Sequence, residues 1–312
     1  MEHYVTLFDS GFLPQGLALY RSLLRHAGPF TLWILCMDAE AKTTLDRLNL
    51  PHIRTIALSD VETPELLAVK PGRNRAEYCW TMTPFTPTLV FERAPEVERV
   101  TYMDADVFLL QSPEPIFREF AASGKAVLIT DHAYAPEYDQ SAVSGQYCVQ
   151  FMTFKRGACE PVRSWWRDRC IEWCFDRAED GKCGDQKYLD DWPQRFASLV
   201  HVLQQLDVLL APWNASRFPY SRAIAWHFHS LRLLPDNKVL LHAPYYVPDI
   251  VHEMIYGPYL AELQAGLKLV GRQVIQKSTH RPVVASFKTL VRNLLRIVRT
   301  QRNYDAVRSL PE

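Results

Sequence analysis

The sequence has no excess of charge of either sign. Its 312 residues include 35 Lys plus Arg and 35 Asp plus Glu, so the formal net charge at pH 7 is zero. Proteins that bind DNA or RNA rely on a basic surface, and a balanced chain lacks the excess that would produce one. We therefore expect no nucleic-acid partner.

The sequence also lacks cysteine pairs of the kind that build disulfide frameworks or zinc sites. Its cysteines number seven, an odd count, and none belongs to a CxxC pair. Cys170 and Cys174 lie four residues apart on an expected helix, but no second pair completes a tetrahedral metal site. We interpret all of them as reduced thiols, which favours a reducing compartment.

Long apolar runs are missing too. The opening residues, MEHYVTLFDSGF, contain no basic n-region and no apolar h-region, and no stretch reaches the roughly 18 apolar residues of a spanning helix. We expect a cytoplasmic protein. Residues 281–303 carry an apolar stripe flanked by Arg and Lys, for which packing on the protein body is the favoured reading. The alternative is peripheral docking on an anionic membrane, at the inner face of the cytoplasmic membrane, or on a partner.

The pattern of apolar residues predicts alternating strands and helices. Residues 3–8 and 30–38 resemble strands, residues 17–27 and 39–50 have helical spacing, and residues 53–60 again resemble a strand. This order indicates an α/β fold with a mostly parallel central sheet covered by helices. Ligands of such sheets bind beyond the carboxyl ends of the strands.

Further helices and strands are expected downstream, and the residue pattern of the sequence changes near residue 240. Residues 64–87 are expected to be irregular. Trp165, Trp166 and Trp173 fall on a long expected helix and are read as core residues. The other expected elements are helices at 87–94 and 158–178, strands at 97–106 and 127–130, and a strand beginning at Tyr147. We expect a main domain at residues 1–240 and a helical C-terminal extension at residues 241–312.

The most informative segment is VTYMDADVFLL, in which an apolar strand runs into Asp104 and Asp106. At this spacing both carboxylates project from the same side of an extended chain. Mg²⁺ or Mn²⁺ takes one or two carboxylates together with the phosphate oxygens of a substrate. A DxD string alone is weak, because haloacid-dehalogenase phosphatases also carry one, although Thr or Val usually stands there in place of Phe108.

At this point the chain resembles GT-A fold (Rossmann-like) glycosyltransferases, in particular the glycogenin-like and lipopolysaccharide galactosyltransferase-like retaining group. The resemblance spans residues 1–235 and rests on segments in the family order. These are HYVTLFDSGFLPQGLALYRSL, RAEYCWTMTPF from Arg75, YMDADVFLLQSPEPIF, Gly184-Asp185-Gln186 and WHFHSLR at residues 226–232.

The resemblance implies roles for individual residues. In the family, the end of the first strand holds uracil and ribose, the two aspartates bind a metal, and the DQ pair lies beside the donor sugar. One late histidine completes the metal site, which we assign to His229 with His227 in reserve. The remaining assignments are Thr6, Leu7, Phe8, Arg75, Asp104, Ala105, Asp106 and Gln150 for the donor and metal, and Asp185 and Gln186 for catalysis.

Two departures from the family pattern affect the donor site. The Asn, Ala or Ser, Gly run that lines the donor sugar is replaced by residues 147–150, Tyr-Cys-Val-Gln, which leaves the donor sugar open. Gln150 could hold sugar hydroxyls by its position. The Gly and Lys that follow the late histidine are also missing, and Arg232 could substitute for them.

Structural explanations compete with the functional ones. Asp185 could simply cap the helix DQKYLDDW, and His227 and His229 could be ordinary strand histidines. Arg75 could pair with a surface carboxylate, and Glu77 could be a helix cap or a substrate contact.

The sequence thus predicts a metal-dependent glycosyltransferase, and the resemblance implies its substrates. The expected donor is a UDP-hexose, and the expected acceptor is a saccharide of a bacterial surface polymer or a glycan primer, with retention of configuration. The alternatives are a metal-dependent phosphatase or nucleotidyltransferase and a non-catalytic protein that binds sugar nucleotides.

Overall fold

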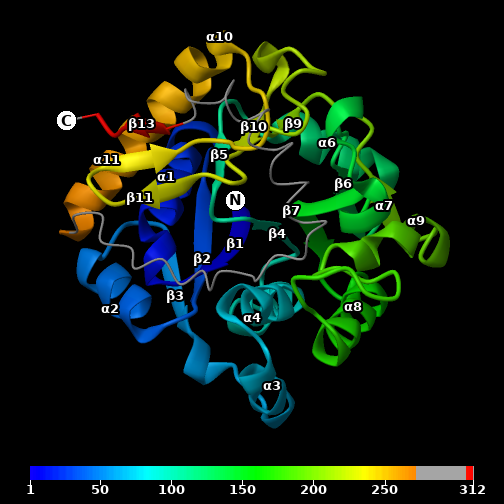
Figure 1. The fold of residues 1–312 in the computed structure, drawn as a ribbon. Helices are drawn as coiled ribbons and strands as arrows, with labels where there is room; N and C mark the ends of the chain where they lie inside the picture. Colours follow the sequence, from blue (N-terminus) through cyan, green and yellow to red (C-terminus); the bar gives the residue numbers. More distant parts are fainter. Residues whose placement is uncertain (272–306, 312) are drawn as a thin grey trace, which may run out of the picture.

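The protein is built around a seven-stranded sheet (Figure 1). The computed structural model describes residues 1–271 and 307–311. The strand order is β3-β2-β1-β4-β7-β6-β8, and every neighbouring pair is parallel except the two that involve β7. The strands are β1 (Glu2–Phe8), β2 (Phe30–Cys36), β3 (Ile53–Ala57), β4 (Arg99–Met103), β6 (Val127–Asp131), β7 (Tyr147–Lys155) and β8 (Val200–Val202).

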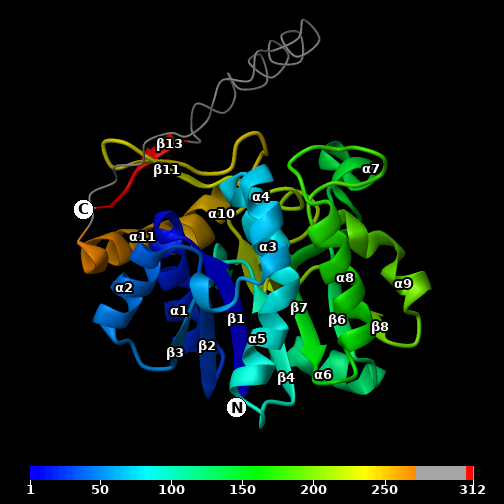
Figure 2. The ribbon, with the colours of Figure 1, turned by 90° about the horizontal axis from the view of Figure 1, so that it is seen from below.

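Helices cover both faces of this sheet, as the sequence predicts (Figure 2). Alternate residues of β1 face opposite sides, so Val5 and Leu7 join one apolar cluster while Tyr4 and Phe8 join the other. The first cluster includes residues of α3 (Pro64–Val69), α4 (Arg75–Met82), α5 (Thr86–Arg93), α8 (Glu160–Glu172) and α9 (Trp192–Arg195). The second includes residues of α1 (Leu13–His26), α2 (Ala39–Leu48) and α6 (Glu114–Ser123).

The expectation that residues 64–87 are irregular is wrong. This stretch contains α3, α4 and a 3₁₀ turn at Thr83–Phe85. Thr63 accepts a hydrogen bond from the amide of Leu66 and begins α3, while Asn74 and Glu77 form a reciprocal capping box at the start of α4. Short helices with strong caps can therefore form where apolar periodicity is weak.

The long helix expected at 158–178 is shorter in the structure. Helix α8 ends at Glu172, because Trp173 is already extended and the Arg73 guanidinium donates to the carbonyls of Cys170, Ile171 and Cys174. Trp166 and Trp173 are buried, as expected for core residues, whereas Trp165 is partly buried and packs against the first apolar cluster. All seven cysteines are free thiols.

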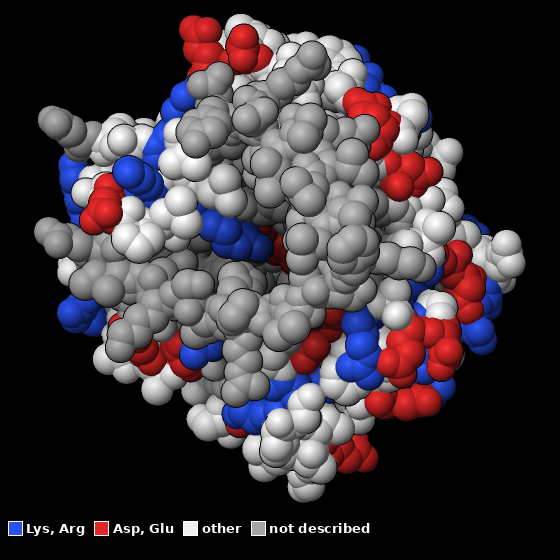
Figure 3. All heavy atoms as spheres, in the orientation of Figure 1, with Lys and Arg blue, Asp and Glu red and all other residues white. Residues whose placement is uncertain are grey.

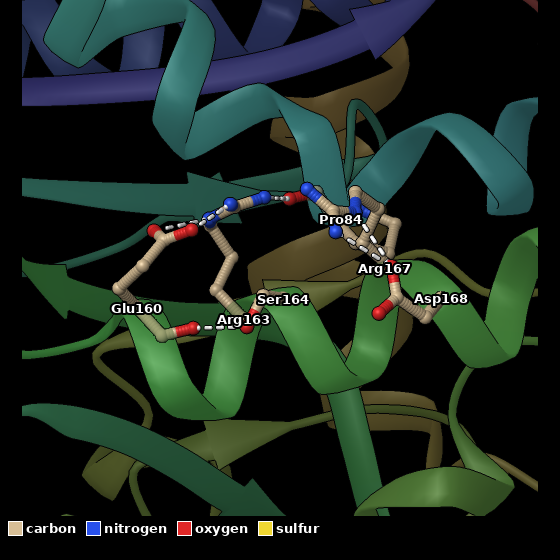
Figure 4. A network of polar contacts seen from close by, with 6 residues as sticks. All are labelled: Pro84, Glu160, Arg163, Ser164, Arg167 and Asp168. Carbon is tan, nitrogen blue, oxygen red and sulfur yellow. Dashed lines mark hydrogen bonds and ion pairs between the residues drawn. The ribbon is translucent and has the colours of Figure 1, made fainter.

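A buried arginine fixes α8 against the turn at Thr83–Phe85 (Figure 4). The side chain of Arg163 is 4% exposed, donates to the carbonyl oxygen of Pro84 across 3.3 Å and pairs with Glu160. One turn further along α8, Arg167 pairs with its neighbour Asp168 at the surface. The contacts of Arg163 hold the turn at Thr83–Phe85 in place, and Thr83 in this turn lies near Asp185.

Helix α11 (Gly257–Val270), near the C-terminal end of the described chain, packs on helix α1. It approaches α1 so closely that a Cβ on Gly266 would lie 3.2 Å from the Cα of Pro14. Glu262 of α11 pairs with Arg21 and Arg25 of α1. The division at residue 240 remains a prediction, and residues 281–303 lie outside the described part.

Two small sheets complete the described fold. One contains β5 (Val107–Leu109), β10 (Ala225–His227) and β9 (Leu209–Leu210), and the other contains β11 (Arg232–Leu234), β12 (Lys238–Leu240) and β13 (Val307–Ser309). Shorter helices are α7 (Ser141–Ser144) and α10 (Asp249–Val251). In the described ranges, no helix has the length and apolar character needed to cross a membrane.

Candidate metal and donor site

The two aspartates of the DxD motif lie in the turn between β4 and β5. The amide of Asp104 donates to the carbonyl oxygen of Gln150 across 3.1 Å, and the amide of Val107 donates back to the carbonyl of Asp104. The phenol of Tyr102 donates to Asp104 Oδ1 across 2.8 Å. The carboxylates are thus presented at the carboxyl end of a buried strand, where ligands of such sheets bind.

A histidine from a distant part of the sequence faces both carboxylates. Strand β10 pairs antiparallel with β5 and sets His227 opposite Val107. His227 Nε2 lies 3.2 Å from Asp106 Oδ1 and 3.8 Å from Asp104 Oδ2. Within the residues that the structure describes, the ligand atoms of Asp104, Asp106 and His227 form one group in which all lie within 4.8 Å of one another.

His229, the metal ligand expected from the sequence, is not in this group. Strand β10 ends at His227, and the imidazole of His229 lies instead among aromatic rings. Its ring centroid is 5.2 Å from that of Trp213 and 6.0 Å from that of Tyr245. Burial and the nearby charge of His227 lower the pKa of His229 to about 3. The geometry therefore places the reserve histidine, His227, with the carboxylates.

The site concentrates titratable groups away from water, and their pKa values diverge. Burial raises the pKa of Asp104. Burial also acts to raise the pKa of Asp106, but the charge and hydrogen bond of His227, together with the smaller influences of His229 and Arg232, hold it below its ordinary value. Burial opposes the charged form of His227, but Asp106 and Asp104 raise its pKa well above the ordinary value. Such opposed shifts are common at functional sites.

The DQ pair lies beside this group. Asp185 is 6% exposed, and its main-chain carbonyl accepts a hydrogen bond from the indole of Trp166. Burial and the negative charge of Asp104 raise the pKa of Asp185 well above its ordinary value, although the nearby hydroxyl of Thr83 acts to lower it.

The helix-cap explanation for Asp185 is wrong. The segment expected to be a helix is a short 3₁₀ turn at Lys187–Asp191, and the residue that precedes this turn is Gln186. The side chain of Gln186 makes no capping hydrogen bond. Asp185 therefore does not cap a helix. Its carboxyl group is close enough to Asp104 for the charge of Asp104 to raise its pKa.

The three residues assigned to base and ribose are buried at the end of β1. Thr6, Leu7 and Phe8 are 0, 7 and 3% exposed, and the ring of Phe8 lies beneath α1. Asp9, which follows them directly, was not among the residues expected at the site. Its position as the first acidic residue beyond a parallel strand was the available signal.

Asp9 forms an ion pair with Arg75. The distance from Arg75 Nη1 to Asp9 Oδ2 is 2.9 Å, and the Arg75 side chain is 72% exposed. Pairing with a carboxylate was one of the two readings of Arg75. Glu77 is a structural residue, because its carboxylate accepts from the amides of Asn74 and Asp176.

The strand that departs from the family pattern borders the candidate metal-binding group. Gln150 is 2% exposed, and its Oε1 lies 2.9 Å from His227 Nδ1. Cys148 is buried near two imidazoles. Burial acts to raise the pKa of its thiol, but the interactions with His132 and, to a smaller extent, His227 together lower that pKa to about 7. Both side chains therefore interact with histidines.

A basic residue also lies near the carboxylates. Arg232 is exposed, and its charge is among the influences that hold the pKa of Asp106 low. Figure 3 shows acidic and basic side chains together at a hollow near the centre of one face of the molecule. Arg232 thus remains available for the phosphate-binding role considered from the sequence.

Sequence comparisons identify relatives without established activities. The protein YfnF of Bacillus subtilis (strain 168) is 30% identical over 255 residues, which are 76% of this chain and 84% of YfnF. The chain belongs to the YfnF family. YfnD of the same organism is 28% identical over 282 residues, which are 84% of this chain and 88% of YfnD, and both relatives are described as uncharacterized proteins. No family model matches the chain.

Structural comparisons confirm the GT-A glycosyltransferase fold expected from the sequence. The galactosyltransferase LgtC, solved with donor and acceptor sugar analogs, matches 88% of this chain and 98% of its own with a TM-score of 0.51 and 13% identity. The bifunctional glycosyltransferase WbbM matches 88% of this chain and 52% of its own with a TM-score of 0.52 and 12% identity. GlyE of Streptococcus pneumoniae TIGR4 matches 86% of this chain and 62% of its own, with a TM-score of 0.51 and 12% identity.

Proposed function

We propose that this protein is a metal-dependent glycosyltransferase that moves a hexose from a nucleotide diphosphate sugar to a saccharide acceptor. The observation that carries the proposal is the group formed by Asp104, Asp106 and His227. Their ligand atoms lie within 4.8 Å of one another at the carboxyl end of β4, in a chain with the GT-A fold. A cation held there would contact a diphosphate bound beyond the sheet edge.

The donor set fits a hard or borderline divalent cation, Mn²⁺ or Mg²⁺. Two carboxylates supply oxygen ligands and an imidazole supplies nitrogen, which suits Mn²⁺ in particular. When bound, the cation would offset negative charge on the departing diphosphate. Burial raises the pKa of Asp104 and the neighbouring charge of Asp106 adds to the rise, so a bound cation would stabilise the ionised carboxylate.

The other residues have roles that do not depend on the cation. Asp185 and Gln186 would orient the hydroxyls of the donor sugar, and the buried position of Asp185 would strengthen its interaction with positive charge developing on that sugar. The end of β1, from Thr6 to Phe8, would border the base and ribose, with the Asp9–Arg75 pair alongside. Arg232 would contact the phosphates.

The finer substrate assignments rest on the family resemblance. We propose UDP-hexose as the donor and a saccharide of a bacterial surface polymer or a glycan primer as the acceptor, with retention of configuration. The similar fold of LgtC, a galactosyltransferase solved with donor and acceptor sugar analogs, supports this assignment. We also propose that the protein acts in the cytoplasm, where nucleotide sugars would be available.

A two-stage experiment tests the function. Purified protein is first screened by thermal shift against UDP, GDP, CMP and TDP sugars with and without Mn²⁺, beside the double variant Asp104→Ala, Asp106→Ala. A ligand that binds only the native state stabilises it, so we expect a Mn²⁺-dependent shift with one nucleotide class that the double variant loses.

The second stage measures the product that leaves the donor. Release of UDP that depends on a saccharide acceptor supports the proposal. Release of inorganic phosphate from simple esters, without nucleotide-sugar binding, would instead indicate a phosphatase. Metal-dependent binding of a UDP-sugar without turnover by any acceptor or by water would indicate a non-catalytic binding protein.

A further inference from the structure

Gln150 contacts two of the three residues in the metal-binding group. It lies on β7, next to β4, and its main-chain carbonyl accepts a hydrogen bond from the amide of Asp104 across 3.1 Å. Its side-chain Oε1 lies 2.9 Å from His227 Nδ1. The residue is 2% exposed, so surrounding packing holds its side chain in place.

The contact with Gln150 decides which nitrogen of His227 carries the proton. An amide oxygen only accepts hydrogen bonds, so Nδ1 must donate to it. A neutral imidazole protonated at Nδ1 has its lone pair on Nε2. Nε2 is the atom that faces Asp106 and Asp104, at 3.2 and 3.8 Å, so a cation bound between them would take the place of the proton on Nε2.

We propose that Gln150 is a positioning residue that holds His227 in the Nδ1–H tautomer and turns its Nε2 lone pair toward the cation. The inference rests on the proposed metal site and goes beyond it, because it assigns Gln150 a role other than contact with sugar hydroxyls. Partners of this kind behind metal-binding histidines fix ring orientation and raise ligand basicity.

The opposite orientation of the amide makes a distinct prediction. With Nε2 of Gln150 turned toward His227, the amide would donate to Nδ1 and select the tautomer protonated at Nε2. That tautomer would donate to Asp106 and could not bind a cation through the same nitrogen. The tautomer of His227 therefore distinguishes a positioning role from simple packing.

The test compares three variants of the full chain. Gln150→Met keeps the length of the side chain without an acceptor, Gln150→Glu keeps an acceptor oxygen, and Gln146→Met is the matched control. Gln146 precedes the same strand, but its amide donates to Asp131. Thermal unfolding without metal shows whether each variant folds.

Two measurements follow on the folded variants. Mn²⁺ affinity, from the signal of free Mn²⁺ in electron paramagnetic resonance, should weaken about 10- to 100-fold in Gln150→Met. It should stay within about threefold of wild type in Gln150→Glu and Gln146→Met. In histidine-labelled protein loaded with diamagnetic Zn²⁺, nitrogen NMR should show His227 protonated at Nδ1, its signals being assigned with His227→Gln.

The outcomes separate this role from the proposed function. Unchanged Mn²⁺ affinity in a folded Gln150→Met variant, or a proton on Nε2 of His227 in the loaded wild type, would overturn the positioning role. Absence of Mn²⁺ binding by the wild type would overturn both the positioning role and the metal site. Normal metal binding with the expected tautomer, but without sugar transfer, would overturn the glycosyltransferase proposal alone.

Discussion

The amide of Phe228 donates a hydrogen bond to the carbonyl oxygen of Asp106 across 2.9 Å. This bond continues the antiparallel pairing of β10 with β5 by one residue beyond the strand. Because side chains alternate along a strand, a shift of one residue in this register would replace His227 with an apolar side chain facing the carboxylates. The register of two three-residue strands thus determines the candidate metal ligand.

The first prediction concerns the two histidines of this segment. We expect His227→Ala to lose the Mn²⁺-dependent rise in melting temperature and His229→Ala to retain most of it, because only His227 lies with both carboxylates. Loss of a direct ligand should weaken Mn²⁺ binding by at least about 100-fold, the upper end of the effect of losing a supporting residue. Titration calorimetry with Mn²⁺ provides the affinities. The reverse result, with His229→Ala losing the shift, would restore the assignment made from the sequence.

The second prediction concerns the buried arginine of α8. Arg163→Met should lower the free energy of unfolding by about 1–3 kcal/mol, because it leaves the Pro84 carbonyl without its donor. Arg167→Met is a matched control one turn along the same helix. Its side chain is 35% exposed and pairs with exposed Asp168, so its effect should be within about 0.5 kcal/mol. Urea unfolding followed by tryptophan fluorescence measures both, and equal effects would contradict the assignment of Arg163.

The third prediction separates binding from stability at Arg75. Its ion pair with Asp9 is exposed on the arginine side, so Arg75→Ala should change the free energy of unfolding by less than about 1 kcal/mol. If Arg75 contacts the donor, the same change should weaken UDP-sugar affinity about tenfold, as expected for roughly 1.4 kcal/mol of lost binding energy. The control is Arg195→Ala, which removes another exposed ion pair, to Asp191, on α9. Unaltered UDP-sugar affinity would leave Arg75 as a surface residue.

The sequence was sufficient wherever local pattern and strand order determine structure. Apolar alternation in residues 3–8 and 30–38 identified β1 and β2, and the position of Asp104 after a buried strand pointed to the carboxylates of the candidate metal site. These features depend on neighbouring residues and on the rule that parallel strands share a carboxyl edge. The same reasoning could have included Asp9, which follows β1 directly.

The sequence was insufficient where distant segments meet. His227 and His229 share a face of an extended strand, and only the pairing of β10 with β5 decides which one approaches Asp106. The contact between Gln150 and His227 joins residues 77 positions apart. By contrast, α3 and α4 have local signals in the sequence, because Thr63 and Asn74 cap their first turns, but their apolar periodicity is too weak to predict helices.

The fourth prediction uses the raised pKa of Asp185 and compares Asp185→Asn with the wild type. Below its ordinary pKa of 3.8, the carboxyl is protonated in both the folded and the unfolded chain and does not affect stability. Between that value and the higher pKa of the folded state, the unfolded chain loses its proton while the folded chain keeps it, so stability falls as pH rises. Each pKa unit of difference removes about 1.4 kcal/mol.

An asparagine at this position resembles the protonated acid and avoids that loss. Asp185→Asn should therefore raise the melting temperature by a few degrees at pH 8, with a gain that shrinks toward zero near pH 4, while sugar transfer falls. Asp180→Asn, at an exposed position, should shift neither value. Scanning calorimetry at pH 4, 6 and 8 measures the trend.

A gain in melting temperature that is independent of pH would show that burial of the Asp185 charge is not its cause. A loss at pH 8 would show instead that the carboxylate is stabilised in the folded protein, because the sign of the difference follows directly from which state holds the proton more tightly.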